Sequence, residues 1–111
     1  MREINVKAIE NTVRDLCIKA NIHLPSSLEK RIKEAAEEEI SPAGINVFDD
    51  LKANLRAADE ENIPICQDTG MAVIFAEIGQ DVHFTGGEFE QAGNAGGSRG
   101  YTCLLYTSDA A

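Results

Sequence analysis

The sequence predicts an α+β fold in which amphipathic helices come first and a short strand segment follows. Up to about residue 62, apolar residues recur at the three- and four-residue spacing of an α-helix. From residue 71 onward the composition changes to a short run rich in β-branched and apolar residues, as in strands. Of the 111 residues, 43% are hydrophobic, so we expect one modest domain with a core of its own.

Charge and hydropathy argue against a nucleic-acid-binding protein and against a membrane protein. The formal net charge is -9, which repels nucleic acid phosphates and anionic membranes, so we expect no nucleic acid and no membrane among the partners. No apolar run approaches the roughly 20 residues of a membrane span. The N-terminal residues lack the apolar middle of a signal peptide. The predicted location is the cytoplasm.

Three helices are expected before residue 64. The first extends from Asn5 to Ala20, and Cys17 lies on its apolar side, where a small buried residue is the ordinary interpretation. The other members of this stripe are Val6, Ile9, Val13, Leu16 and Ala20. His23 follows this helix, and its position is typical of a linker residue.

The second and third helices have recognisable start signals. Ser26 and Glu29 have the spacing of a capping box. The apolar face of this helix consists of Leu28, Ile32 and Ala35 or Ala36. Ser41-Pro42 starts the third helix, because proline suits the first helical turn. The third stripe ends before Pro64 and consists of Phe48, Leu51, Leu55 and Ala58.

The part after residue 70 predicts strands and turns. The near-continuous apolar run from Met71 to Ile78 predicts a strand that is buried on both faces. Residues 79–81 predict a turn, Val82–Phe84 a second short strand, and Gly86-Gly87 another turn. We interpret His83 in that strand as structural. From Glu88 to Tyr101 the spacing is helical, yet each glycine there costs about 1 kcal/mol in a helix interior, so helix and loop both remain open.

Chemically useful side chains gather where the helical pattern ends and the strand pattern begins. The consecutive residues there are Cys66, Gln67, Asp68 and Thr69, followed by Gly70. Cys66 has three interpretations: a buried structural thiol, a redox or nucleophilic thiol, or a ligand of an iron–sulfur cluster or another soft metal. The redox interpretation is the weakest, because no second cysteine is close in sequence. Beside a metal, Asp68 could be tuned for proton transfer.

Residues 2 to about 89 resemble the N-terminal part of the iron–sulfur hydro-lyases, class I fumarase and its tartrate dehydratase relatives. Within that family the alpha subunit of the two-subunit type is the most similar. The resemblance rests on three segments, which are Thr12-Val13-Arg14-Asp15-Leu16-Cys17-Ile18-Lys19-Ala20-Asn21, Ile63-Pro64-Ile65-Cys66-Gln67-Asp68-Thr69-Gly70-Met71 and Glu77-Ile78-Gly79-Gln80-Asp81-Val82-His83.

The resemblance implies a function and a set of site residues. Cys66 would be one of three thiolates that hold a [4Fe–4S] cluster with one iron open to substrate. Gln67, Asp68 and Thr69 would bind substrate, and Asp68 would also be the catalytic acid–base group. The reaction would be reversible hydration of fumarate to malate. The alternatives are a tartrate dehydratase alpha subunit and, from another class, a non-catalytic helical interaction module.

The resemblance also implies partners. These are a small dicarboxylate substrate, a beta subunit or C-terminal domain, and further copies in a homo-oligomer. We therefore interpret residues 1–101 as an incomplete N-terminal part of the hydro-lyase domain, and residues 102–111 as an atypical tail that is not native to the family. The two other cluster cysteines of the family lie beyond Ala111, so Cys103 does not replace either.

Two stretches depart from the family pattern. The glycine-rich Gly93 to Gly100 stands where the family continues a helix, and no arginine follows Tyr101 where the family has a substrate-binding one. We expect this chain alone to be inactive.

Overall fold

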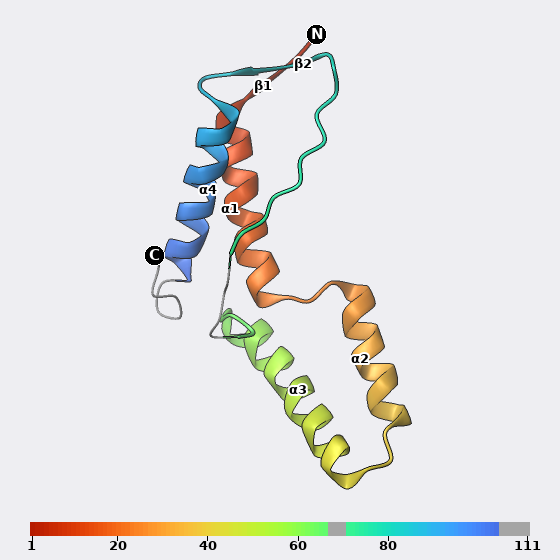
Figure 1. The fold of residues 1–111 in the computed structure, drawn as a ribbon. Helices are drawn as coiled ribbons and strands as arrows, with labels where there is room; N and C mark the ends of the chain where they lie inside the picture. The colour runs from red at the N-terminus through yellow and green to blue at the C-terminus, as the bar shows by residue number, and fades with distance from the viewer. Residues whose placement is uncertain (67–70, 105–111) are drawn as a thin grey trace. The chain divides into compact units, whose positions relative to one another are not determined.

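A computed structural model describes residues 1–66 and 71–104 of the chain. The described elements are four helices and a two-stranded sheet, which confirms the predicted α+β class (Figure 1). The chain divides into two compact units. The first consists of residues 1–19 together with the chain from residue 68 onward, and the second of residues 20–67. In order, the elements are β1 (Arg2–Asn5), α1 (Val6–Ile22), α2 (Ser26–Glu38), α3 (Pro42–Glu61), β2 (Val82–Thr85) and α4 (Phe89–Cys103).

The sheet pairs the N-terminus with a distant segment. Strands β1 and β2 run parallel, with Arg2 opposite Val82 and Asn5 opposite Thr85. The Arg2 amide also donates to the Asp81 carbonyl at 2.8 Å. The sequence predicts β2 but not β1, because four residues are too few to show a strand period. The turns on either side of β2 are confirmed, and Gly86 and Gly87 both have positive φ.

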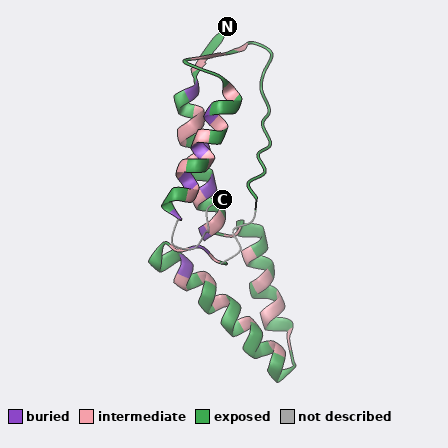
Figure 2. Cartoon of the chain, turned by 60° about the vertical axis from the view of Figure 1, so that its left-hand side comes forward, coloured by how far each residue is buried: buried purple, intermediate pink, exposed green. Residues whose placement is uncertain are grey.

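Helices α1 and α4 pack against each other through small residues. The buried residues of α4 are Ala92, Gly96 and Gly100, which share one face at helical spacing. Figure 2 shows buried positions on both helices. A Cβ atom at Gly100 would lie 2.9 Å from the Cβ of Cys17, so glycine is needed for this close approach. The stretch that the sequence left open is therefore a helix. Gly96 and Gly100 are tolerated in it because they form the surface that contacts α1.

The α1 stripe is confirmed only in part. Val6, Val13 and Cys17 are buried, as predicted, and the helix extends to Ile22. Leu16 and Ala20, which the spacing also assigns to the stripe, are exposed, Leu16 to 56%, so those two assignments are wrong. A narrow glycine-lined contact covers fewer positions than a wide apolar face does.

The second unit contains the α2–α3 hairpin, and its caps differ from one another. The predicted capping box of α2 is wrong, because Pro25 is the N-cap and no side-chain cap bond forms. The Pro25 carbonyl instead accepts from the amides of Leu28 and Glu29, both at 3.0 Å. The predicted start of α3 is confirmed: the Ser41 side chain accepts from the Gly44 amide at 3.4 Å, with Pro42 in the first turn.

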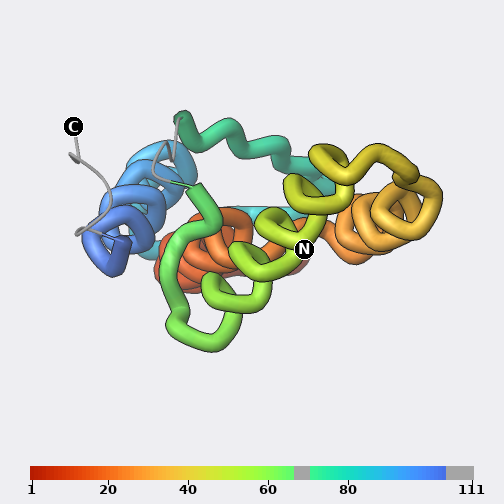
Figure 3. The backbone as a smooth tube through the Cα atoms, turned by 90° about the horizontal axis from the view of Figure 1, so that it is seen from below, coloured from red at the N-terminus to blue at the C-terminus, as the bar shows by residue number. Residues whose placement is uncertain are grey.

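The apolar run from Met71 to Ile78 is not a strand, which corrects the prediction of a strand buried on both faces. Its residues are exposed, and in Figure 3 the run is an extended trace outside the α1–α4 pair. The physical reason is that pairing requires a neighbour, and in the described residues β2 pairs with β1 instead. Among the described helices, none combines the length and the apolar character needed to cross a membrane.

Candidate functional site

The candidate site begins where α3 ends. Asn62 adopts the left-handed conformation with φ of 53°, and its amide donates to the Ala58 carbonyl. The amide of Ile63 donates to the same carbonyl at 3.1 Å. Asparagine tolerates this conformation, and Pro64 two residues later cannot continue a helix. The chain therefore leaves α3 in a fixed direction just before Cys66, as the sequence predicts.

Ile65 is held from both sides. Its amide donates to the carbonyl of Asn21, in the last turn of α1, at 2.8 Å. Its carbonyl accepts a hydrogen bond from the side-chain amide of Asn54 on α3, also at 2.8 Å. Pro64 beside it is buried. These contacts fix the backbone one residue before Cys66. Sequence reasoning missed Asn54, because an asparagine on the polar side of a helix carries no signal without its partner.

Cys66 itself is exposed. The interpretation of this residue as a buried structural thiol is therefore wrong. Its thiol is accessible to a metal or a substrate, as a ligand must be. Gln67, Asp68 and Thr69, the other predicted site residues, lie outside the described residues.

The two remaining cysteines have different surroundings. Cys17 is buried against α4, and desolvation raises the pKa of its thiol, which disfavours the thiolate that metals bind. Cys103 is exposed at the last position of α4, in the other unit from Cys66. Cys66 thus fits a thiolate-bound metal as one donor. Nowhere in residues 1–66 and 71–104 do three or more histidine, cysteine or acidic side chains gather closely enough to hold an ion.

The two histidines have different surroundings, and His23 lines a pocket of the second unit together with Asp59. The His23 Nδ1 atom lies 3.5 Å from a carboxylate oxygen of Asp59, and both side chains are substantially exposed. His83 is exposed on β2.

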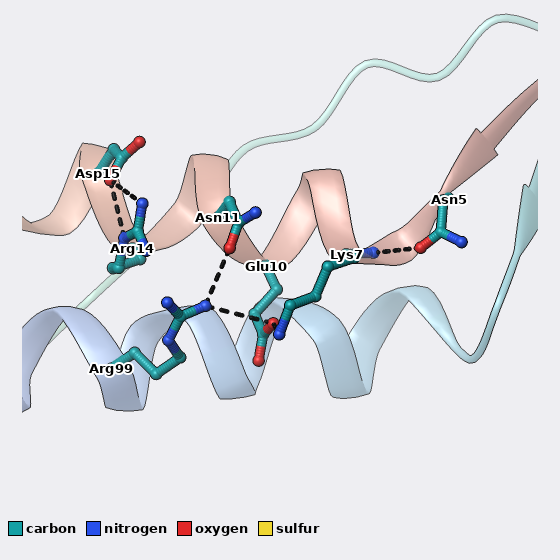
Figure 4. A network of polar contacts seen from close by, with 7 residues as sticks. All are labelled: Asn5, Lys7, Glu10, Asn11, Arg14, Asp15 and Arg99. Atoms are coloured by element: carbon teal, nitrogen blue, oxygen red, sulfur yellow. Dashed lines mark hydrogen bonds and ion pairs between the residues drawn. The ribbon is translucent and has the colours of Figure 1, made fainter.

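A second polar cluster joins α1 to α4 (Figure 4). The Arg99 guanidinium donates to the Asn11 side-chain oxygen at 2.9 Å and lies 3.3 Å from a Glu10 carboxylate oxygen. Lys7 forms an ion pair with the same carboxylate. The hydrogen bond from Lys7, together with the charges of Lys7 and Arg99, lowers the pKa of Glu10. One carboxylate oxygen of Glu10 thus pairs with a cation from each helix, so this cluster helps to hold the two helices together.

Comparisons with known proteins establish the family. The fumarate hydratase (Fumerase) family matches residues 10–106, and this chain belongs to that family. The match includes the glycine-rich stretch and continues beyond Tyr101. One relative is the “Putative L(+)-tartrate dehydratase subunit alpha” of Methanocaldococcus jannaschii, which is 32% identical over 75 residues. That alignment covers 68% of this chain but only 26% of the relative. A comparison with solved structures finds no match.

Proposed function

We propose that this chain is the N-terminal part of an iron–sulfur-dependent hydro-lyase that interconverts fumarate and malate. The protein that contains the complete family sequence is called the parent protein below. Membership of the fumarate hydratase family supports the reaction class. The alignment covers only 26% of the tartrate dehydratase relative, which supports a parent protein longer than this chain.

The proposal rests on two features of Cys66, namely the fixed backbone before it and the exposure of its side chain. Hydrogen bonds from Asn54 and to Asn21 hold the preceding residue, and the thiol itself is exposed. An inert thiol in a helical interaction module has no need of such an anchored and open position. A ligand needs both features, because a metal site requires accessible donors on a fixed backbone.

A [4Fe–4S] cluster held by three thiolates would supply a Lewis-acidic iron for the carboxylate and hydroxyl of the substrate. Cys66 would be one of the three ligands, and the other two would come from family sequence outside this chain. Cys17 does not fit this role, because its side chain is buried in the contact between α1 and α4, against Gly100.

The residues after Cys66 would act on the substrate. Hydration of a double bond requires a proton at one carbon and water at the next. Asp68 would exchange that proton, and the Gln67 amide would orient a substrate carboxylate by hydrogen bonding. The Thr69 hydroxyl would add a further hydrogen bond to the substrate. Each of these groups is within three residues of the proposed ligand, so one short segment would serve both metal and substrate.

The substrate class is a small dicarboxylate, with tartrate as the alternative to fumarate. The name of the relative favours tartrate as strongly as the family name favours fumarate. The same name contains the word subunit, which supports a partner, either a beta subunit or a C-terminal domain. Residues 1–101 would belong to the hydro-lyase domain, and we place the parent in the cytoplasm as a homo-oligomer.

The test compares cysteine variants of the parent protein after anaerobic cluster reconstitution. We expect Cys66→Ala to lose most of the bound iron and all hydration of fumarate. Cys17→Ala is the control, because Cys17 is also a free cysteine but is buried and has no proposed role as a ligand. Assays with malate and tartrate as competing substrates decide between the two reactions. Unchanged iron content in Cys66→Ala would contradict the ligand assignment.

A further inference from the structure

Residues 71–78 form an extended segment with several exposed apolar side chains. Met71 is 84% exposed and Phe75 is 93% exposed, with Val73, Ile74 and Ile78 each at least half exposed. Soluble proteins rarely leave contiguous apolar surface open unless something binds there. This surface lies directly after the proposed site segment, so what covers it matters for the site.

The backbone of this segment has no hydrogen-bonding partner within residues 1–66 and 71–104. The segment nevertheless runs extended, as Figures 1 and 3 show. The next segment, β2, is also extended, and it is paired with β1. Residues 71–78 and β2 are thus both extended, but among the described residues only β2 has a strand beside it to pair with.

The side-chain pattern indicates an interior strand. Successive residues of a strand point to opposite faces, so Met71, Val73 and Phe75 share one face, and Ile74 and Ile78 the other. Both faces are apolar, which is typical of a strand in a sheet that is covered on both sides. Glu77 is the one charged residue of the segment. Strands at a sheet edge ordinarily carry more charge than this, because an apolar edge aggregates.

Within the described residues the sheet is small. It consists of two parallel strands of four residues each, whereas stable sheets generally need three or more strands. The tartrate dehydratase relative carries about three quarters of its length outside the aligned region, which is ample for further strands.

We propose that in the parent protein, unlike in this chain, residues 71–78 form an interior strand of a larger sheet, and that the neighbouring strands belong to the part of the parent outside this chain. The inference rests on the proposed function only in that it requires a longer parent.

Amide hydrogen exchange tests the proposal without reference to iron or activity. In the 111-residue chain we expect residues 71–78 to exchange at nearly the unprotected rate. In the parent protein we expect exchange at least about 100-fold slower, because strand amides open only with their sheet. Equal, fast exchange in both proteins would overturn the proposal. Protection that appears in the 111-residue chain as its concentration rises would instead identify a second copy as the occupant.

A matched pair of substitutions locates the effect. Phe75→Lys places a charge at a position that is 93% exposed in this chain, so the melting temperature of the 111-residue chain should not change. In the parent it should accelerate exchange of the segment at least about tenfold, since an interior strand cannot accept a charge. Ile40→Lys is the control, because Ile40 is 90% exposed and lies between α2 and α3. It should leave the exchange of residues 71–78 unchanged.

The two proposals fail separately. If Cys66→Ala keeps its iron while residues 71–78 are protected, the ligand assignment is wrong and the strand stands. If iron binding depends on Cys66 while the segment exchanges freely in the parent, the function stands and the strand is wrong.

Discussion

Two helix pairs in this molecule are held together in different ways. In the first unit, α1 and α4 bury Val13 and Cys17 against the glycine face of α4. In the second unit, α2 has no buried residue, and Leu28 and Leu51 of the hairpin are 47% and 43% exposed. The regular amphipathic stripe of α2 is thus only partly buried, while the glycine-rich α4, with the weaker apolar pattern, has fully buried residues.

The comparison indicates that the distance between two helix backbones, and not the regularity of the apolar stripe, determines which side chains are buried between them. Glycine lets backbones come near enough for van der Waals contact along the whole interface. Leucine and isoleucine on α2 and α3 would need a broader partner to be covered. The α1–α4 pair is therefore the more closely packed of the two.

The largest expected effect comes from filling the glycine contact. In Gly96→Ala the new Cβ would meet the backbone carbonyl of Glu10 and lie 2.8 Å from the Val13 Cβ. Overpacking of this kind costs about 1–3 kcal/mol, and the helix must shift because the obstacle is backbone. Thermal unfolding of the 111-residue chain, followed by circular dichroism, measures the loss.

The control for that substitution is Gly97→Ala. A Cβ at Gly97 would have no neighbour within 4 Å, so only helix propensity changes. The variant should gain up to about 1 kcal/mol. If the two alanine variants unfold at the same temperature, the close contact between α1 and α4 is not formed.

Removal of the Asn54 side chain should have a smaller effect on stability and a local effect on the site. Asn54→Ala deletes the hydrogen bond to the Ile65 carbonyl, which is worth about 0.5–1.5 kcal/mol. We also expect faster amide exchange at Ile65 and weaker iron retention in the reconstituted parent. Asn46→Ala is the matched control, since Asn46 is exposed on the same helix. An identical response of both variants would exclude a positioning role.

The acid side of the stability curve should report the Glu10 cluster. Lys7 and then Arg99 lower the pKa of Glu10 below its ordinary value of 4.5. The carboxylate therefore stabilises the folded chain above that pH, and the contribution is lost as pH falls through the lowered value. Glu10→Gln should be less stable than the wild type at pH 7, and the difference in melting temperature should vanish at low pH.

Glu37→Gln provides the comparison, because Glu37 is exposed on α2 and no ion pair is recorded for it in the described part of the chain. Its melting temperature should follow the wild type at every pH. A constant difference between Glu10→Gln and the wild type across the acid range would show that the carboxylate charge is not the cause.

The smallest effect is expected on the hairpin. Leu28→Ala removes a large apolar side chain from the stripe of α2, yet the side chain is 47% exposed. The free energy of unfolding of the 111-residue chain should change by no more than about 0.5 kcal/mol. A loss of the size seen for Gly96→Ala would mean that the hairpin is as tightly packed as α1 and α4.

Local signals predicted much of the fold. The helix ends marked by Pro42 and by Asn62 are where the sequence places them, because capping and proline geometry act within a few residues. The capping box predicted at Ser26 does not form, and the reason is again local. The carbonyl of Pro25 accepts the hydrogen bonds from the Leu28 and Glu29 amides. Strand β1 could not be found, because its partner lies about 80 residues away.

For the candidate site, too, some features could be predicted from the sequence and others could not. The sequence alone placed Cys66 at the end of a helix and at the centre of a family signature. It did not contain the anchoring by Asn54, because that bond joins residues eleven positions apart through the geometry of the turn. The roles of Gln67, Asp68 and Thr69 stay predictions.

The sequence by itself determined the helices before residue 64, the position of the candidate site and the family to which the chain belongs. Short-range spacing, caps and a contiguous motif are sufficient for all three. Only the tertiary structure decided which glycines form a contact, which apolar residues are buried and whether the apolar run at 71–78 is paired. These outcomes depend on what lies opposite each residue in space, and a residue's neighbours along the chain do not specify that.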